Sequence, residues 1–458
     1  MFEFAQYILN DINMGPIIKE KTSINISNKN LCKYAMVLIV FWILSPLYIM
    51  VFNFFKIDVH TMYDFWSYVL TFTGGFGLIV GGLYLYNAFY KSTAPDKLKI
   101  SIPLILVLAF IIWALASTIN SESKWLALTG YDTARATFPV FCFYAGMMFN
   151  GLTLASDSKR LKRVVHIFLL VATILAILAL MNNHITEMLC ENEMTDCPAY
   201  TSVFFNTNHY AYYILISILI CAYTFLYSKN NFEKVIASGL LILFVNLLVL
   251  NDTMGSYLAA LLTLIFTIVW SFINHETDKK GPFELLLLFL VATLITCFYT
   301  DNVLRNFVSM FSDFSFLSKY LLGDESLLLE ASAAGSGRGE LWLQGIDIIK
   351  QHPILGVGPQ NIGIDVHNLF IQIAMYIGIP GLLIYIAFLI SGVLRLIHNR
   401  KGISLIVKAS AFIVVGYLIS SFFGVVVFYT EPYFYIVLGV CLSGILKPVI
   451  DDDGVLYE

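Results

Sequence analysis

The chain has 458 residues, of which 59% are hydrophobic and only 13% are charged, and its formal net charge is −4. A soluble domain keeps roughly a quarter of its residues charged, so this composition excludes an ordinary soluble enzyme. The apolar residues fall in runs long enough to cross a hydrocarbon layer of about 30 Å as helices, which satisfy their own backbone groups within lipid. We therefore expect an all-α polytopic membrane protein that contacts the lipid bilayer, with no nucleic acid as a partner.

The first part of the chain differs from the rest because residues 1–34 are mixed and polar. They contain no short apolar core followed by a cleavage site, so we expect no removable signal peptide. The apolar positions from Phe2 to Ile12 are compatible with a helix lying on the inner membrane surface. A disordered tail fits the same residues equally well.

Hydropathy predicts about twelve transmembrane helices. They lie near 35–55, 66–89, 100–119, 136–154, 164–183, 207–227, 235–250, 254–273, 283–300, 379–396, 403–425 and 433–448. The expected organisation is a cytoplasmic segment (1–34), transmembrane helices 1–9 (35–300), a large helical external loop (301–378), transmembrane helices 10–12 (379–448) and a cytoplasmic tail (449–458).

The orientation follows from Lys and Arg, which accumulate on the cytoplasmic side of membrane proteins. With the N-terminus inside, only seven of the 27 basic residues fall in external loops. The cytoplasmic segments hold the rest, including the cluster from Lys159 to Arg163. We therefore expect both termini in the cytoplasm and the long loop before helix 10 on the outside.

The loop from 301 to 378 is the longest connection, and a connector of this length inside a compact bundle is usually functional. Its segment Gly339–Gln351 has the pattern of an amphipathic helix, with Trp342 on the apolar face. Further on, Val366–Ile377 predicts a helical piece that re-enters the membrane before a break at Gly378–Gly381. Irregular backbone at that depth requires protein or a water-filled cavity around it.

His367 and Asn368 lie at the start of this helical piece. A neutral imidazole can take a proton from an attacking hydroxyl near neutral pH, and an adjacent amide could orient the ring or hold a sugar hydroxyl. A His-Asn cap at a helix start accounts for the same pair. The spacing alone leaves both interpretations open.

Arg338 belongs to the same loop, which contains more acidic than basic residues. A phosphate site in this loop would therefore depend on individually placed guanidinium groups, whose planar fork suits phosphate oxygens. The alternative role for Arg338 is a surface salt bridge with Glu330 or Glu340.

Other polar residues fall at the predicted outer ends of the helices. Asn208 and His209 open the sixth helix, where His209 either lines a polar site or simply reaches the interface. Arg135 could supply a second positive charge, although a solvated loop position explains it as well. The external pair Cys190 and Cys197 fits a disulfide or two free thiols. We find no metal-ligand spacing and no phosphate- or dinucleotide-binding glycine motif, so we expect neither a metal nor a cofactor.

At these residues the sequence resembles the O-antigen ligase and polymerase superfamily of bacterial envelope enzymes. The resemblance rests on the order of short motifs, which extend to Asn208-His209 and to Gly130. The main ones are Arg338-x-x-x-Trp342, the QHPILGVG stretch over 351–358, His367-Asn368 and Gly378-Ile379-Pro380-Gly381.

The resemblance implies a metal-independent, inverting glycosyl transfer on the outer face of the plasma (inner) membrane. The donor would be a glycan on undecaprenyl diphosphate, and the acceptor a glycan or a second lipid-linked glycan. His367 would activate the acceptor hydroxyl, and Arg338 would bind the diphosphate, whose developing charge a fixed guanidinium can stabilise. Further substrate contacts would come from Asn368, Asn208, His209 and Trp342.

One stretch departs from the resemblance. Many relatives carry Ser-Arg-Gly at the start of the helix after the seventh, and that arginine also contacts phosphate. The matching residues here are Thr253-Met254-Gly255-Ser256, which include no basic residue. Either Arg135 or Arg305 takes its place, or the diphosphate is held by fewer charges.

The superfamily includes polymerases, which extend lipid-linked repeats, and ligases, which pass a finished glycan to lipid A core or to a protein. The Lys-, Asn- and Ile-rich composition resembles members from low-GC Gram-positive bacteria, which lack lipid A. This favours polymerisation of capsular, exopolysaccharide or O-antigen-type repeats. A transporter of lipid-linked glycans is the alternative from another class, and it is disfavoured because transporters place charges at the bilayer midplane.

Overall fold

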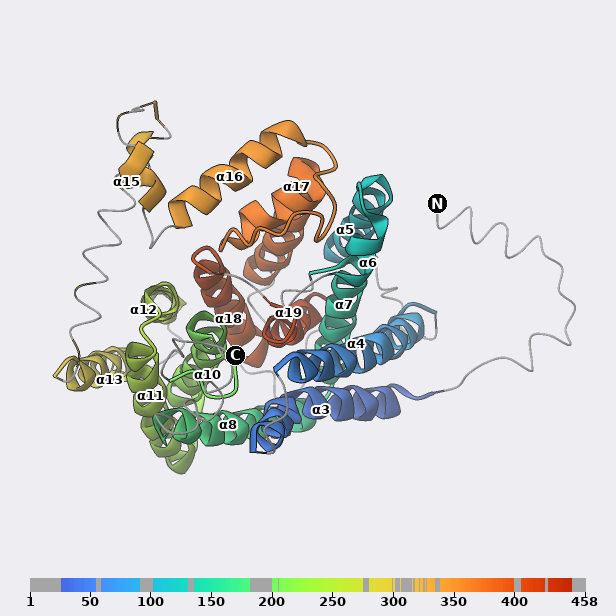
Figure 1. Cartoon of the computed structure of the whole chain (residues 1–458). Coiled ribbons are helices and arrows are strands. Elements are labelled where there is room, and N and C mark those ends of the chain that lie inside the picture. The colour runs from blue at the N-terminus through green and yellow to red at the C-terminus, as the bar shows by residue number, and fades with distance from the viewer. Residues whose placement is uncertain are drawn as a thin grey trace, which may run out of the picture.

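The computed structural model describes residues 26–54, 59–90, 102–130, 136–181, 200–204, 206–274, 280–298, 338–398, 405–424 and 427–446, together with scattered residues from 300 to 333. The regular structure in these parts of the chain is helical (Figure 1). The first seven helices are α3 (Asn28–Phe54), α4 (Val59–Tyr90), α5 (Ile102–Asn120), α6 (Lys124–Thr129), α7 (Phe138–Leu154), α8 (Ser158–Met181) and α10 (Thr207–Tyr227). The remaining eight are α11 (Asn231–Leu250), α12 (Met254–Asn274), α13 (Lys280–Cys297), α15 (Leu328–Ala333), α16 (Arg338–Gln351), α17 (Leu369–His398), α18 (Leu405–Ser421) and α19 (Glu431–Leu446).

The all-α class is confirmed for the described residues, and nine of their helices are long and apolar enough to cross a membrane. Three further predicted spans coincide with the shorter apolar helices α7, α18 and α19. The count of twelve crossings and their orientation therefore stay predictions. Several predicted starts were wrong: α3 begins at Asn28 instead of 35, α4 at Val59 instead of 66 and α8 at Ser158 instead of 164. The helix expected at 379–396 begins at Leu369.

Several predictions fall on residues outside the described ranges. They are the surface helix near the N-terminus, the cysteine pair Cys190 and Cys197, Arg135, and the cytoplasmic tail over 449–458.

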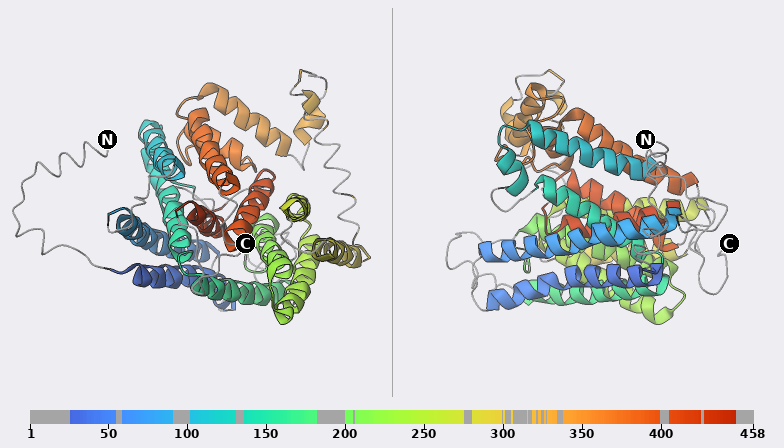
Figure 2. Two further views of the ribbon diagram at one scale, coloured as in Figure 1. Left: turned by 180° about the vertical axis from the view of Figure 1, so that it is seen from behind. Right: turned by 90° about the vertical axis from the view of Figure 1, so that its right-hand side faces the viewer.

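The centre of the bundle is formed by α7 and α19, which pack against each other (Figure 1). On one side α7 also packs against α4 and α3, and on the other α19 packs against α18, which in turn contacts α10 and α12. Seen from the side in Figure 2, the long helices run side by side, and α6 lies near one end of them. α16 lies across the first half of α17 (Figure 1).

Glycines allow the central helices to approach at backbone distance. A Cβ atom on Gly439 of α19 would collide with the carbonyl oxygen of Met148 in α7, and a Cβ on Gly151 of α7 would collide with that of Ile436. Lipid tails are as apolar as leucine, so van der Waals packing at small residues is a main source of helix association in membranes. This contact fixes α19 in the middle of the bundle.

The predicted break near Gly378 is present inside α17. Ile377 and Gly378 have non-helical dihedral angles, and Gly378 has a φ of 75°. A side chain there would collide with the carbonyl oxygen of Ile354, so glycine is required both by conformation and by space. The helical piece expected over Val366–Ile377 begins at Leu369 and continues through this kink.

The backbone groups that the kink leaves without helical partners are bonded elsewhere in the protein. Trp113 Nε1 donates to the Ile377 carbonyl at 2.9 Å, and Ser117 Oγ donates to that of Tyr376 at 2.9 Å. The amides of Val357 and Gly358 donate to Met375 and Tyr376 at 3.0 and 2.9 Å. Protein atoms therefore cover the irregular backbone, as polar groups inside a membrane protein require.

We predict that Gly439→Ala destabilises the protein, because the added Cβ overpacks the α7–α19 contact. The expected cost is about 1–3 kcal/mol, measured by thermal unfolding of the purified protein in detergent. The matched control is Gly239→Ala in α11, where a Cβ meets no atom within 4 Å. Since alanine favours a helix, this control should be neutral or stabilising. A Gly439→Ala protein that melts with the wild type would contradict the packing argument.

Candidate active site

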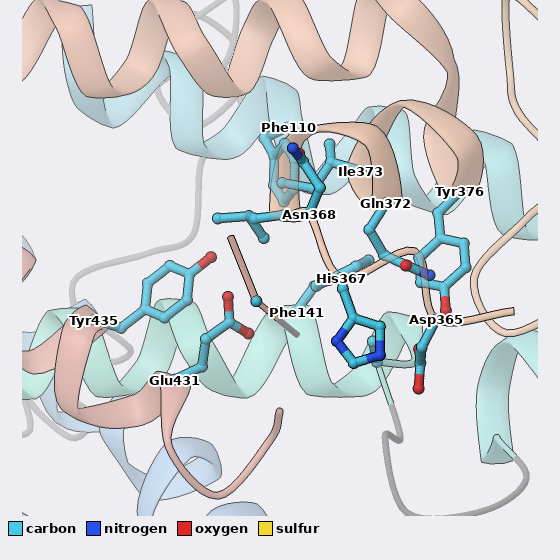
Figure 3. A pocket seen from close by; sticks show the side chains of 13 residues that line it. Phe110, Phe141, Asp365, His367, Asn368, Gln372, Ile373, Tyr376, Glu431 and Tyr435 are labelled. Atoms are coloured by element: carbon cyan, nitrogen blue, oxygen red, sulfur yellow. The ribbon is translucent and has the colours of Figure 1, made fainter. Parts of the chain in front are cut away.

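A pocket lies where α5, α7, α17 and α19 come together, and its lining combines polar and aromatic side chains (Figure 3). His367, Asn368 and Asp365 enter it from the segment before α17, and Glu431 and Tyr435 from α19. The remaining lining residues are Phe110, Ala136, Phe141, Leu369, Gln372, Ile373, Tyr376 and Gly424. His367 and Asn368, which the sequence singled out, thus both line this pocket.

The loop before His367 is held by hydrogen bonds from two directions. Asn361 exchanges bonds with the backbone of Ser123, accepting from its amide at 2.7 Å and donating to its carbonyl at 3.2 Å. Gln372 of α17 reaches back and accepts from the Val366 amide at 3.0 Å. His367 itself has a φ of 50°, a left-handed conformation that is uncommon for a residue with a side chain. Backbone held in such a region often occurs at functional sites.

Asn368 is the N-cap of α17, since its Oδ1 accepts from the amides of Phe370 and Ile371 at 3.0 and 3.1 Å. Its Nδ2 donates to the Phe422 carbonyl at 3.0 Å, and the side chain is 2% exposed. Both polar atoms are thus occupied by protein groups. The alternative that the sequence left open, a helix cap, describes this geometry, and Asn368 positions His367 against the end of α18.

The His367 imidazole is half-buried, and its buried Nδ1 has no hydrogen-bond partner among the described residues. Burial and, as the smaller cause, the positive charge of Arg338 together lower the pKa of His367 from its usual 6.5 to about 4. The ring is therefore neutral at pH 7 and able to accept a proton.

Arg338 begins α16 and lies close enough to His367 for its charge to act on the imidazole. Burial lowers its pKa, and an interaction with Tyr212 opposes this effect, but a guanidinium stays protonated in proteins. No carboxylate in the described parts of the chain forms an ion pair with it, so the salt bridges with Glu330 and Glu340 that the sequence allowed are not formed. A desolvated cation at a helix N-terminus, where the helix dipole adds positive potential, suits an anionic ligand.

His209 joins this group from α10. Its ring interacts electrostatically with His367, and its Nδ1 forms a short hydrogen bond with the hydroxyl of Tyr429. Tyr429 is stacked on Trp66 of α4, with ring centroids 4.6 Å apart and planes inclined by 10°. The imidazole is thus held in place by α4 and by the segment before α19, and it does not simply reach for the interface.

The other predicted residues have different positions. Asn208 is half-buried in the first turn of α10, where its amide donates to Asn206 at 2.9 Å. Trp342 packs edge-on against Phe422 with ring centroids 5.6 Å apart, and its buried Nε1 has no partner within the described chain. Arg305 is exposed. None of these three residues lines the pocket.

The stretch Thr253-Met254-Gly255-Ser256, which lacks the arginine of many relatives, lies against α18. Ser256 and Ser420 share a hydrogen bond of 2.6 Å, and a Cβ on Gly255 would come within 2.6 Å of the Phe423 side chain. This part of the protein is closely packed next to Phe422, which accepts the bond from Asn368. The stretch thus lies close to the contact between Asn368 and Phe422, and its own residues carry no positive charge.

Sequence reasoning missed Glu431, Tyr435 and Tyr429. Glu431 stands just before Pro432 at the start of the last apolar run, and this isolated acid was the available signal. Tyr429 and Tyr435 gave no signal, because aromatic residues occur throughout the chain. Within the described residues, no group of three or more His, Cys, Asp or Glu side chains is arranged to hold a metal ion.

Comparison with protein families finds a match for the segment 239–386, which contains Arg338, Trp342, His367 and Asn368. The matching family is described as O-antigen ligase. This match to about a third of the chain supports its similarity to the O-antigen ligase and polymerase superfamily. Its members are membrane enzymes of the glycosyltransferase type, and the resemblance found in the sequence is confirmed. Comparison with curated proteins finds no match.

We predict that Asn368→Ala lowers the stability of the protein by about 1–2 kcal/mol and also impairs activity, because the cap and the bond to Phe422 are both lost. Thermal unfolding and glycan-transfer assays on the same preparation measure the two effects. Asn230→Ala is the matched control: Asn230 caps α11 and accepts from Phe232 at 2.9 Å, but it lies outside the pocket. This control should lose a similar cap and keep its activity. Full stability of Asn368→Ala with loss of substrate binding would show that Asn368 is a ligand-binding residue instead.

Proposed function

We propose that this protein polymerises undecaprenyl-diphosphate-linked oligosaccharide repeats into a capsular, exopolysaccharide or O-antigen-type glycan on the outer face of the plasma membrane. The observation that carries the proposal is the proximity of Arg338 and His367. These residues are separated by a helix and a loop in the sequence, yet the guanidinium acts directly on the pKa of the imidazole. The charge of Arg338 thus acts on a base that lines the pocket, although Arg338 is not itself a lining residue.

The proposed reaction is a single displacement. The neutral His367 ring takes the proton of the acceptor hydroxyl as its oxygen attacks the anomeric carbon of the donor. The bond between that carbon and the diphosphate oxygen breaks, and the electron pair leaves with the diphosphate. Arg338 stabilises this developing charge in a partly desolvated site, where an electrostatic interaction is stronger than in water. Attack opposite to the leaving group inverts the configuration of the anomeric carbon.

The stretch 253–256 contains no arginine, which is consistent with a site in which Arg338 supplies the main positive charge for the diphosphate. Arg305 and Arg135 are proposed to add to it when substrate is bound. His209, Asn208 and Trp342 are proposed to surround the substrate, and the His209 ring interacts electrostatically with His367. Asn368 contributes by orienting His367.

The second candidate function is that of a ligase, which the name of the matching family favours. A ligase would carry the same donor chemistry and differ only in the acceptor, lipid A core or a protein in place of a lipid-linked repeat. The composition of the chain supports the polymerase. The family match disfavours the transporter alternative.

We predict that His367→Ala and Arg338→Ala each fold but lose glycan transfer, by roughly 100-fold to 10,000-fold for the base and 100-fold to 1,000-fold for the charge. The measurement is polymer length on gels, with purified protein and lipid-linked repeats as the only substrate. Matched controls are His166→Ala, an exposed histidine of α8, and Lys350→Ala, an exposed base of α16 that pairs with Asp347 at 2.8 Å. Wild-type polymer from His367→Ala would refute its assignment as the base.

The same assay distinguishes the two candidate functions. Extension with lipid-linked repeats alone supports the polymerase. Transfer that requires lipid A core or a protein as a second acceptor supports the ligase and contradicts our preference.

The depressed pKa of His367 predicts an unusual pH profile. Because the base is the neutral ring, kcat/KM, which reports on the free enzyme, should fall only as the pH drops towards about 4, not near the usual 6.5. Binding of the diphosphate should offset the charge of Arg338 and raise the pKa of His367. The acid limb of kcat, which reports on the complex, should therefore lie at a higher pH than that of kcat/KM. An acid limb of kcat/KM near pH 6.5, or one unmoved by substrate, would contradict this coupling.

A further inference from the structure

Glu431 is a carboxylic acid within the bundle that the proposed reaction does not use. It is the first residue of α19, is 6% exposed, and lines the same pocket as His367. No Lys, Arg or His of the described chain forms an ion pair with it. Burying a carboxyl group without an ion-pair partner is costly, so such a group is usually retained for binding or catalysis.

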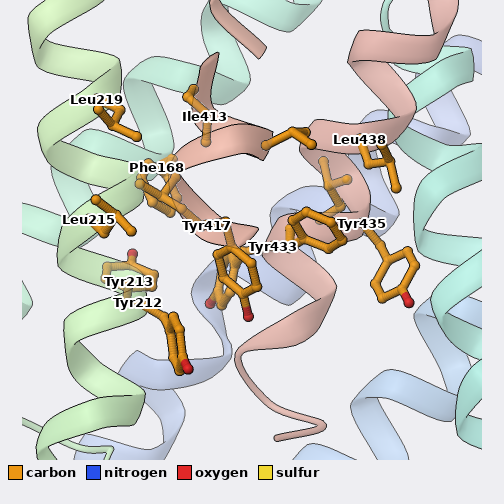
Figure 4. Packing of buried hydrophobic residues seen from close by; sticks show 14 of the residues in the cluster. Phe168, Tyr212, Tyr213, Leu215, Leu219, Ile413, Tyr417, Tyr433, Tyr435 and Leu438 are labelled. Atoms are coloured by element: carbon orange, nitrogen blue, oxygen red, sulfur yellow. The ribbon is translucent and has the colours of Figure 1, made fainter. Parts of the chain in front are cut away.

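Four tyrosines from four different helices converge behind this carboxyl group. Each interacts electrostatically with Glu431, and each has a buried hydroxyl without a hydrogen-bond partner in the described residues; they are Tyr144 of α7, Tyr212 of α10, Tyr385 of α17 and Tyr417 of α18. Tyr212 and Tyr417 stand close together in Figure 4, and their ring centroids are 5.0 Å apart. Buried hydroxyls are normally satisfied. The protein has thus gathered polar groups around one point of an otherwise apolar core.

A structural role accounts for only part of this arrangement. An acid in the first turn of a helix interacts favourably with the helix dipole, and Glu431 occupies that position. An exposed side chain would serve the dipole equally well, without the cost of burial. The dipole also gives no reason for the carboxyl group to line a pocket.

The walls of the pocket suit a sugar ring. Phe110 and Phe141, with ring centroids 5.8 Å apart, supply apolar surface, and Tyr435 is stacked on Tyr144 at 4.8 Å. In Figure 3 the Glu431 carboxyl and the Tyr435 hydroxyl point into the space beside the His367 ring. Aromatic surface with a few directed polar groups is the usual composition of a small-molecule site.

We propose that Glu431 binds the acceptor sugar, by accepting hydrogen bonds from its ring hydroxyls while His367 faces the hydroxyl that attacks. Glu431 is therefore a binding residue for the glycan and not for the diphosphate, which belongs to Arg338. This inference rests on the proposed function, and it divides the site into a sugar part near α19 and a phosphate part near α16.

The test separates these two parts with two probes. One is the oligosaccharide released by mild acid from the lipid-linked glycan of the producing cells, which retains its sugars and has lost the diphosphate and lipid. The other is undecaprenyl diphosphate, which carries no sugar. Binding of each to the full-length protein in detergent is measured by calorimetry, and folding by thermal unfolding.

Glu431→Gln should weaken oligosaccharide binding several-fold, because an oxygen that accepts a hydrogen bond is replaced by an amide NH2 group, and should leave undecaprenyl diphosphate binding within about twofold. Arg338→Ala should instead weaken the binding of undecaprenyl diphosphate and leave oligosaccharide binding within about twofold. Glu340→Gln is the matched control, since Glu340 is exposed on α16 and bonded to Gln344 at 3.2 Å. It should bind both probes as the wild type does.

Oligosaccharide binding unchanged in a folded Glu431→Gln protein overturns the inference and leaves the proposed function intact. Failure of the wild type to bind either probe overturns the proposed function itself. If Glu431→Gln does not fold, Tyr435→Phe replaces it: this variant removes the neighbouring hydroxyl and keeps the ring. Tyr435→Phe should weaken oligosaccharide binding several-fold, and binding with wild-type affinity would overturn the inference.

Discussion

The break in α17 at Ile377 and Gly378 determines where the candidate site lies. A helix interrupted inside a bundle exposes carbonyl and amide groups that lipid cannot satisfy. Trp113 and Ser117 of α5, and the amides of Val357 and Gly358, bond those groups. The same bonds attach the chain after α16 to the kink and so fix both ends of the loop that carries His367. The loop that carries His367 is therefore ordered because protein groups bond the backbone of the kink.

The site itself combines one positive charge with two histidines that would be repelled by it if they were protonated. Arg338, His367 and His209 are buried or half-buried within reach of one another's fields. Burial keeps His367 neutral, and an anionic ligand would relieve the positive charge of Arg338. Electrostatic preorganisation of this kind is the largest contribution in many enzymes, because the dipoles and charges need not reorient during the reaction. On the opposite side, Glu431 and its tyrosines offer acceptors and hydroxyls, which suit a sugar instead of a phosphate.

Patterns in the sequence predicted those features that depend on neighbouring residues in the chain. Apolar runs predicted the helices because each run must satisfy its own backbone, and α16 was predicted to within one residue from its amphipathic pattern. Glycine and proline predicted the break near Gly378. Helix starts were less accurate. The polar first turn of α3 at Asn28 carries no hydropathy signal, and α17 was divided at the Gly378–Gly381 break, through which the helix continues as a kink. The pair His367 and Asn368 was found, but its spacing could not separate a base from a cap.

The sequence by itself determined the helical membrane class, the resemblance to the superfamily and the segment that holds His367 and Arg338, since these depend on composition, periodicity and short motifs. Only the tertiary structure decided which polar groups meet. The approach of Arg338 to His367, the bond between His209 and Tyr429, and the convergence of four tyrosines on Glu431 join residues from separate helices. No local pattern specifies such contacts, because they follow from how the helices pack and which buried groups are left to satisfy one another.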